Sequence, residues 1–247
     1  MHIISSLVLM AAVATAAPSR SSHAKRADIA DPALIRDLIT APTMADRIKL
    51  LPNDSDFVFK FSDPPFSRAV TTGDGGRSVT ANRATFPALI GSGVSMTVGF
   101  LDACGFNTPH THPRAAEMNI VVEGRMETQF IMENGARPVY NKVEKFDLVI
   151  FPPGSMHAEF NPDCEPATFV AGFGDEDHGV QQTAQTFFGL DNAMLDATLG
   201  GSGSTISGKD IDTFRDFIPK NIALGVDACL EKCGLSRNAK RELRKSY

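Results

Sequence analysis

Two histidines stand two residues apart in the segment GFNTPHTHPRAAEMNIVVEG, residues 105–124. His110 and His112 would point to the same side of a β-strand, because alternate strand residues share one face. Glu117 follows on what we expect to be the next strand, and His157 lies farther along in a second strand-like run. Three imidazoles and one carboxylate suit first-row transition metals, and a six-coordinate ion would keep two positions open for chemistry.

The elements that would position these side chains are short strands. From about residue 77 to 173, short β-rich runs alternate with turn sequences such as ENG, PPG and NPD, which indicates an antiparallel sandwich or barrel. Residues 31–50 have helical spacing, with Pro32 in a first turn and Pro42 dividing the run into two helices. We expect TTGDGG at 71–76 to be a loop, and helical extensions to follow residue 175.

The N-terminus has the features of a targeting segment. Residues 1–16 predict a signal peptide ending at Ala14-Thr15-Ala16, and residues 17–26 predict a propeptide ending at Lys25-Arg26, although a leader left in place is the alternative. No later apolar run reaches membrane length. We therefore expect a secreted protein, extracellular or in a cell wall, with no membrane partner and with a glycosylation acceptor at Asn53.

Composition limits the other function classes. The 247 residues can bury one sizeable core, and the net charge of −5 argues against a nucleic-acid partner. The sequence contains no G-x-S-x-G motif for a hydrolytic nucleophile, and its GDGG cluster lacks the lysine of a phosphate-binding loop.

Two motifs resemble those of the cupins. Residues 105–124 read G-x4-H-x-H-x4-E-x6-G, and residues 152–161 read P-x-G-x2-H-x3-N. The stretch NTPHTHPRAAE is very similar to germins and to their fungal and slime-mould relatives, the spherulin-like proteins, and the resemblance covers roughly residues 30–225. One departure is Phe146, which stands where the second motif opens with glycine.

The resemblance implies a mainly β protein: a single cupin jelly-roll β-barrel over 77–174, with helical extensions at 27–76 and 175–247. It implies one transition-metal ion per chain, held by His110, His112, Glu117 and His157. In germins this ion is Mn(II), while ligand chemistry alone leaves Fe, Zn, Cu and Ni open. It further implies a homo-oligomer (dimer, trimer or hexamer) and a small-molecule substrate.

Three functions remain open within this resemblance. Oxalate oxidases of the germin type hold their substrate with two asparagines; one matches Asn107, while Thr97 stands in the place of the other. The dianion then loses a fixed donor, so we rank a superoxide dismutase-like oxidoreductase above an oxalate oxidase. A non-catalytic wall, storage or encystment protein with a structural metal is the third reading.

Secretion makes the four cysteines candidates for disulfides. The resemblance places the strand of His110 beside the strand of His157, and continuing this antiparallel pairing brings Cys104 nearly opposite Cys164. We therefore predict a Cys104–Cys164 bridge, with Cys229 and Cys233 either bridged to each other or free.

Overall fold

The computed structural model describes residues 27–200, 215 and 217–236. The predicted signal peptide and propeptide lie outside the described residues. So do residues 201–208 of the Gly/Ser-rich segment and residues 237–247 of the basic C-terminal segment.

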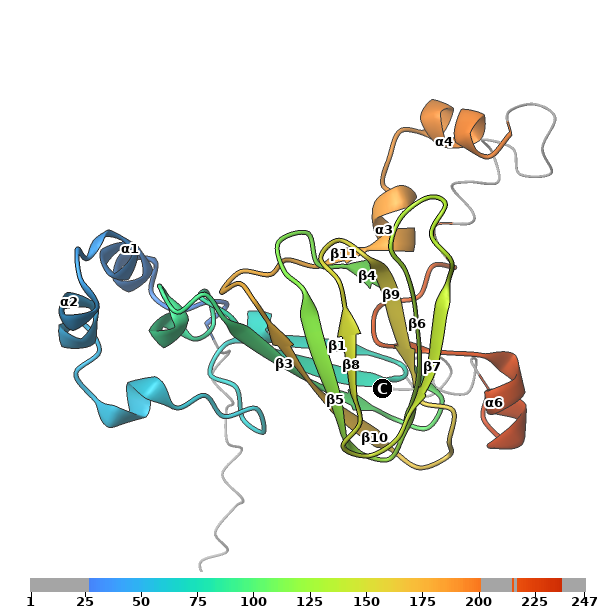
Figure 1. Ribbon diagram of the computed structural model, residues 1–247, viewed down its shortest axis with the longest axis horizontal. Coiled ribbons are helices and arrows are strands. Elements are labelled where there is room, and N and C mark those ends of the chain that lie inside the picture. Colours follow the sequence, from blue (N-terminus) through green and yellow to red (C-terminus); the bar gives the residue numbers. More distant parts are fainter. Residues whose placement is uncertain (1–26, 201–214, 216, 237–247) are drawn as a thin grey trace, which may run out of the picture.

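Two antiparallel sheets face each other and form the body of the molecule (Figure 1). The first sheet has the strand order β1 (Val70–Gly73), β2 (Gly76–Ala81), β3 (Ser95–Leu101), β10 (Ala167–Phe173), β5 (Glu117–Glu123) and β8 (Leu148–Phe151). The second has the order β11 (Gln181–Gln182), β4 (Gly105–Thr111), β9 (Met156–Phe160), β6 (Met126–Ile131) and β7 (Val139–Val143), with β12 (Ala223–Leu224) also paired to β4. The predicted mainly β fold is thus confirmed.

The space between the sheets is filled by side chains that alternate along the strands. Val121, Met126, Phe151 and Phe169 are at most 1% exposed and belong to one apolar cluster. Burial of such side chains contributes about 1.5–3 kcal/mol each. The apolar cluster fills one part of the interior, and buried polar side chains occupy another.

The N-terminal helices form as the sequence predicts. Helix α1 (Pro32–Thr40) begins with Asp31, whose side chain accepts a hydrogen bond from the Ala33 amide at 2.9 Å, and α2 (Met44–Lys49) follows after the break at Pro42. Leu38 of α1 is 1% exposed and packs with Leu51 and Ile90 in a separate small core. Three short 3-10 helices complete this half: η1 (Asp54–Phe57), η2 (Ser67–Ala69) and η3 (Pro87–Leu89).

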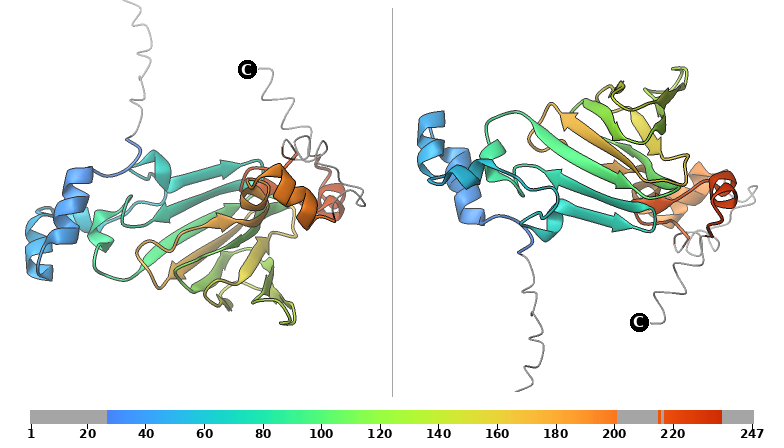
Figure 2. Two further views of the ribbon diagram at one scale, coloured as in Figure 1. Left: turned by 90° about the horizontal axis from the view of Figure 1, so that it is seen from above. Right: turned by 90° about the horizontal axis from the view of Figure 1, so that it is seen from below.

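The C-terminal helices are α3 (Thr183–Phe187), α4 (Asn192–Thr198) and α6 (Asp227–Lys232). Figures 1 and 2 show α1 and α2 at one end of the sandwich and α6 at the other. None of the described helices is long and apolar enough to cross a membrane.

The predicted disulfide pairing is wrong. Cys104 is bonded to Cys229 and Cys164 to Cys233, with Cα–Cα distances of 5.8 and 5.4 Å. The two strands do pair, with His110 opposite His157, but the register shifts between Asn107 and His110, and the pairing ends at Phe106 and Phe160. Cys104 has φ +56° in the turn before β4, and α6 packs against that turn, so both bridges attach α6 to the sandwich.

The expected loop at 71–76 is also wrong in part, because Val70–Gly73 and Gly76–Ala81 pair as the hairpin β1–β2. The glycines here serve close packing. A Cβ atom on Gly73 would lie 2.0 Å from the carbonyl oxygen of Ile222, and one on Gly75 would lie 1.8 Å from that of Ala223. The glycine-rich sequence therefore lets the C-terminal segment cross the hairpin at backbone contact distance.

Phe146 takes a backbone conformation that favours glycine. Its φ is +71°, in the left-handed region, and the side chain is 69% exposed. The turn is nevertheless closed, because the Phe146 amide donates to the Val121 carbonyl at 2.8 Å and the Asp147 amide to that of Glu144 at 3.0 Å. The substitution adds local backbone strain of about 1–2 kcal/mol and keeps the turn.

Candidate metal centre

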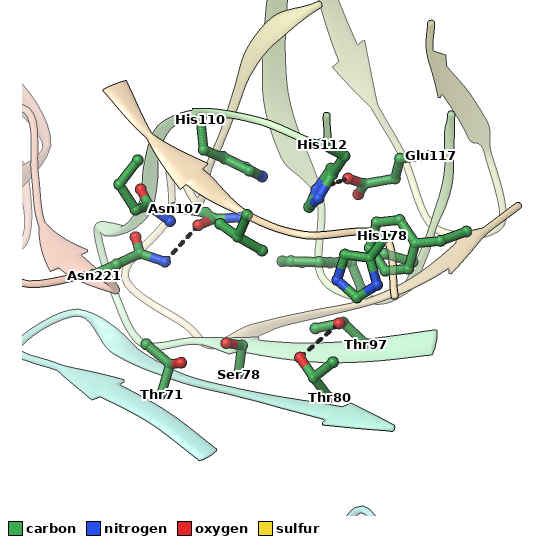
Figure 3. A pocket seen from close by; sticks show the side chains of 15 residues that line it. Thr71, Ser78, Thr80, Thr97, Asn107, His110, His112, Glu117, His178 and Asn221 are labelled. Carbon is green, nitrogen blue, oxygen red and sulfur yellow. Dashed lines mark hydrogen bonds and ion pairs between the residues drawn. The ribbon is translucent and has the colours of Figure 1, made fainter. Parts of the chain in front are cut away.

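Four buried side chains converge between the two sheets. His110 on β4 faces His157 on β9, His112 follows directly after β4, and Glu117 opens β5 of the opposite sheet. Each is at most 4% exposed, and one potential ligand atom from each lies within 4.8 Å of all the others. Figure 3 shows His110, His112 and Glu117 at one side of a pocket. The sequence motifs thus mark residues that the fold brings together into a group able to hold a metal ion.

The hydrogen bonds of the three rings fix which nitrogen faces the centre. In each ring Nδ1 contacts a main-chain carbonyl oxygen, which can only accept, so Nδ1 carries the proton and the neutral ring keeps a lone pair on Nε2. The contacts are 2.9 Å for His110 with Thr108, 2.6 Å for His112 with Gly179 and 2.9 Å for His157 with Ser155. Such contacts hold a ligating histidine in its orientation.

The four groups therefore present only acceptors to one another. Nε2 of His112 and of His157 lie 2.9 and 3.1 Å from the same oxygen of Glu117, and Nε2 of His112 has no hydrogen-bond partner. Buried lone pairs at this spacing repel unless a metal ion or a shared proton lies among them. The donor set thus fits a bound metal ion.

The protonation states in the ion-free protein also suit a ligand set. Burial lowers the pKa of His110 to about 3, and the neighbouring His157 and His112 add to this effect. Burial alone would raise the pKa of Glu117, but contacts with His112 and His157 outweigh it and hold this pKa below its usual range. His110 is thus neutral and Glu117 ionised at neutral pH, as metal binding requires.

A second buried carboxyl group, Glu159, lies beside the candidate ligands, and sequence reasoning missed it. Burial raises its pKa well above the usual value, and the charge of Glu117 raises it further. Its oxygens accept hydrogen bonds from Asn107 at 2.9 Å and, more weakly, from Asn119 at 3.5 Å. Asn119 also donates to Glu117 at 3.0 Å. Glu159 is two residues after His157 on one strand face, and that spacing was the available signal.

Asn107, the predicted substrate-binding residue, lines the same pocket but already has two protein partners. Its Oδ1 accepts from Nδ2 of Asn221 at 2.7 Å, and its Nδ2 donates to Glu159. Asn221 comes from the C-terminal segment and no sequence motif marks it. Thr97, in the place of the second asparagine, also lines the pocket, and its hydroxyl lies 2.8 Å from that of Thr80.

The pocket next to the four side chains has a volume of about 320 Å³. Besides the groups already named, its lining includes the hydroxyl side chains Thr71 and Ser78 and the imidazole of His178. His178 is 2% exposed and its ring centroid lies 5.0 Å from that of His112. Burial, with a smaller effect of His112, lowers the pKa of His178 to about 4.

Comparison with known proteins agrees with this fold. A family described as "Cupin" matches residues 62–206. The chain is 44% identical to Spherulin-1A of Physarum polycephalum over 84% of this chain and 81% of that protein. It is 33% identical to Germin-like protein 5-1 of Oryza sativa over 68% of this chain and 78% of that one. The chain therefore belongs to the cupin family, and its relatives there are spherulins and germin-like proteins.

Solved structures support the fold. An oxalate oxidase in complex with the substrate analogue glycolate superposes with a TM-score of 0.58 at 23% identity, covering 66% of this chain and 81% of that chain. An oxalate decarboxylase of Bacillus subtilis gives a TM-score of 0.52 at 16% identity, over 67% of this chain and 43% of that chain. At these identities the likeness concerns the fold alone.

Proposed function

We propose that the protein binds one manganese ion through His110, His112, Glu117 and His157 and dismutates superoxide. The observation that carries the proposal is the convergence of three Nε2 lone pairs and one carboxylate, with no donor among them, beside a pocket. Such a set suits a first-row transition ion with positions left open for a small ligand.

Dismutation converts two superoxide anions and two protons into dioxygen and hydrogen peroxide. A manganese ion at this site would supply the one-electron couple between Mn(II) and Mn(III). The chain would supply a fixed, water-poor surrounding: the four side chains are buried, and the Asn107 amide keeps one N–H for a small anion because only the other is used by Glu159. The overall charge of −5 gives no long-range attraction for the anion, so access relies on the pocket itself.

Oxalate oxidation is the weaker candidate. A dianion needs several fixed donors or cations, since unpaired buried charge is costly. The Thr97 hydroxyl is shared with Thr80, and the Asn107 amide has a single N–H left, so one fixed donor remains where a dianion needs several. Among the described residues that line the pocket, none is Lys or Arg.

A structural role for the ion is the second candidate, and one feature favours it. The histidines belong to the second sheet and Glu117 to the first, so an ion would cross-link the two sheets. Binding to the folded state alone would stabilise the protein by mass action, with or without catalysis. A manganese-loaded protein that is stable but inert in both assays would support this candidate.

The proposal also covers the location and the partners of the protein. Two disulfides are typical of chains that fold in an oxidising compartment, which supports secretion after removal of residues 1–26. Asn53 is exposed and available for glycosylation. The small-molecule substrate would be superoxide, with no nucleic-acid or membrane partner.

A homo-oligomer is supported by the outer face of the first sheet. Met96, Met118 and Ile150 are 41–56% exposed and lie in one row across adjacent strands, with Gly172 between the two methionines. Leu148, 60% exposed, extends the row. An exposed apolar row of this kind marks a contact surface, and a second copy of the chain is the occupant that we propose.

The test is a pair of assays on the mature chain loaded with manganese: superoxide consumption and peroxide release from oxalate. We expect superoxide dismutation to exceed oxalate oxidation and to disappear in the His110→Ala variant. His178→Gln is the matched control, because it changes a buried histidine outside the ligand set and should retain the ion. Robust peroxide release from oxalate that requires His110 would overturn the ranking.

A further inference from the structure

The wall of the pocket opposite the candidate metal ligands carries a row of hydroxyl groups. Thr71 pairs with Ser78 across β1 and β2, and Thr80 pairs with Thr97 across β2 and β3. Ser78 and Thr80 are two residues apart on one strand, so all four side chains share the inner face of the first sheet. Figure 3 shows them together along one side of the pocket, opposite the labelled metal-ligand candidates.

Half of this row is free to bind a ligand. The Thr80 and Thr97 hydroxyls satisfy each other at 2.8 Å. The hydroxyls of Thr71 and Ser78 have no hydrogen-bond partner in the part of the chain that the structure describes. Each can donate once and accept twice, so this wall offers donors and acceptors but no charge.

His178 adds a buried acceptor to the same pocket. The Ser95 hydroxyl lies 2.6 Å from the carbonyl oxygen of Asp175, so it donates there, and His178 Nδ1 at 2.8 Å must donate to Ser95. The neutral ring therefore keeps a lone pair on Nε2, for which the described residues provide no hydrogen-bond donor. The ring is held in place by stacking on Phe173, with centroids 3.8 Å apart and planes at 7°.

The charge of the pocket lining favours uncharged ligands over organic anions. Its described residues include no Lys or Arg, and the one carboxylate, Glu117, belongs to the metal-ligand candidates. An organic anion away from the ion would therefore lie beside hydroxyls and a lone pair with no cationic partner, which is unfavourable for buried charge. A molecule with several hydroxyl groups can donate to Nε2 of His178 and exchange hydrogen bonds with Ser78 and Thr71. Its C–H groups can pack on Phe169, which also lines the pocket.

We propose that this outer part of the pocket binds a small uncharged polyhydroxylated molecule of polyol or monosaccharide size. The Nε2 atom of His178 accepts from one ligand hydroxyl, and Ser78 and Thr71 bind others. The proposal goes beyond superoxide dismutation, because none of these three residues is a candidate metal ligand. A cavity of about 320 Å³ has room for a ligand of this class.

The experiment uses the full mature chain, with metal and after chelation, and the probes glycerol, xylitol and glucose with oxalate and glycolate as anionic comparators. Binding is measured by saturation-transfer NMR and calorimetry. We expect at least one neutral probe to bind in both metal states, because its contacts do not need the ion. If the manganese-loaded protein lacks dismutase activity and a neutral probe still binds, the proposed function fails while this proposal stands.

Variants test the named contacts. Ser78→Ala and His178→Phe should each weaken the bound neutral probe by about three- to tenfold, the effect of one hydrogen bond. Thr71→Ala should act likewise, while Thr72→Ala is the matched control, since its side chain lies on the other face of β1. If His178→Phe fails to fold, Ser78→Ala still decides the matter. Anions binding more tightly than every neutral probe to the chelated protein, or unchanged binding in Ser78→Ala, would overturn the proposal.

Discussion

The hydroxyl groups of Thr80 and Thr97 lie 2.8 Å apart across β2 and β3, and each satisfies the other inside the pocket beside the candidate metal centre. Thr97 stands where germin-type oxalate oxidases are expected to have an asparagine. Its hydroxyl is therefore both the wrong group and already engaged, which leaves a dianion without that donor.

This contact gives the first prediction. Thr97→Asn should raise oxalate turnover, because the longer side chain reaches beyond Thr80 and adds an amide donor, and about tenfold is the gain expected from one good hydrogen bond to a charged ligand. Peroxide release from oxalate measures it, with Thr97→Val as the control that removes the hydroxyl and adds no donor. An unchanged rate in a manganese-loaded Thr97→Asn protein would show that the missing donor is not the obstacle.

The contribution of His110 to the stability of the ion-free protein should fall as the pH is lowered. The pKa of His110 is about 3 in the folded chain and near 6.5 when unfolded, so the unfolded state binds more protons between these values. Stability is then lost from about pH 6.5 down to about pH 3, with a slope of up to about 1.4 kcal/mol per pH unit. Below about pH 4.5 the lowered pKa of Glu117 adds a loss of the same sign.

Urea unfolding of the chelated protein at a series of pH values measures this dependence. The His110→Asn variant is the matched control, and its stability should depend less on pH between 6.5 and 4.5. The raised pKa of Glu159 acts with the opposite sign in this interval, so the comparison between the two proteins is the test. An equal pH dependence in the wild type and in His110→Asn would contradict the assigned protonation state of His110.

The disulfides provide a third prediction. A non-reduced digest should yield the Cys104 peptide linked to Cys229 and the Cys164 peptide linked to Cys233. The first bridge spans 125 residues, and a cross-link of that length stabilises a folded chain by about 5 kcal/mol in the chain-entropy account. The Cys104→Ser/Cys229→Ser double variant should lose a comparable amount in urea. A Cys104–Cys164 linked peptide would refute this pairing.

Phe146 gives a fourth prediction. Phe146→Gly should stabilise the protein by up to about 1 kcal/mol, because relief of the left-handed strain exceeds the entropy that glycine adds to the unfolded chain. Metal content should not change, since the turn lies outside the candidate ligand set. Lys145→Gly, at the neighbouring position, is the control and should not stabilise. A clear loss of stability in Phe146→Gly would mean that the exposed ring contributes more than its backbone strain costs.

A fifth prediction concerns assembly. Met118→Glu places a charge in the apolar row on the outer face of the first sheet and should shift the protein to a smaller species in light-scattering measurements. Glu123→Gln, also on β5, is the control that adds no charge and should leave the assembly as it was. A wild-type monomer, or an assembly unaffected by Met118→Glu, would exclude this surface as the contact between copies.

Local spacing predicted a large part of the fold and site. The two-residue period of His110 and His112 and the turns around the short strands follow from the chain itself, and the helix break at Pro42 follows from proline chemistry. The facing of His110 and His157 followed from the family resemblance and holds in the structure.

The remainder depends on contacts between distant segments. Asn221 reaches the pocket only because the C-terminal segment pairs with β4, and the Cys229 bridge depends on where α6 packs. Extending the ladder from His110 to Cys104 failed because a register shift and a turn intervene. No periodic pattern in the sequence predicts the packing of the C-terminal segment or the register shift between Cys104 and His110.

Elemental analysis of the purified mature protein tests the central claim most directly. The account predicts about one transition-metal ion per chain, mainly manganese, which is lost in His110→Ala and His157→Ala and retained in His178→Gln. A wild-type protein that neither contains nor takes up a transition metal, or His110→Ala and His157→Ala variants that keep a full complement of the ion, would contradict it.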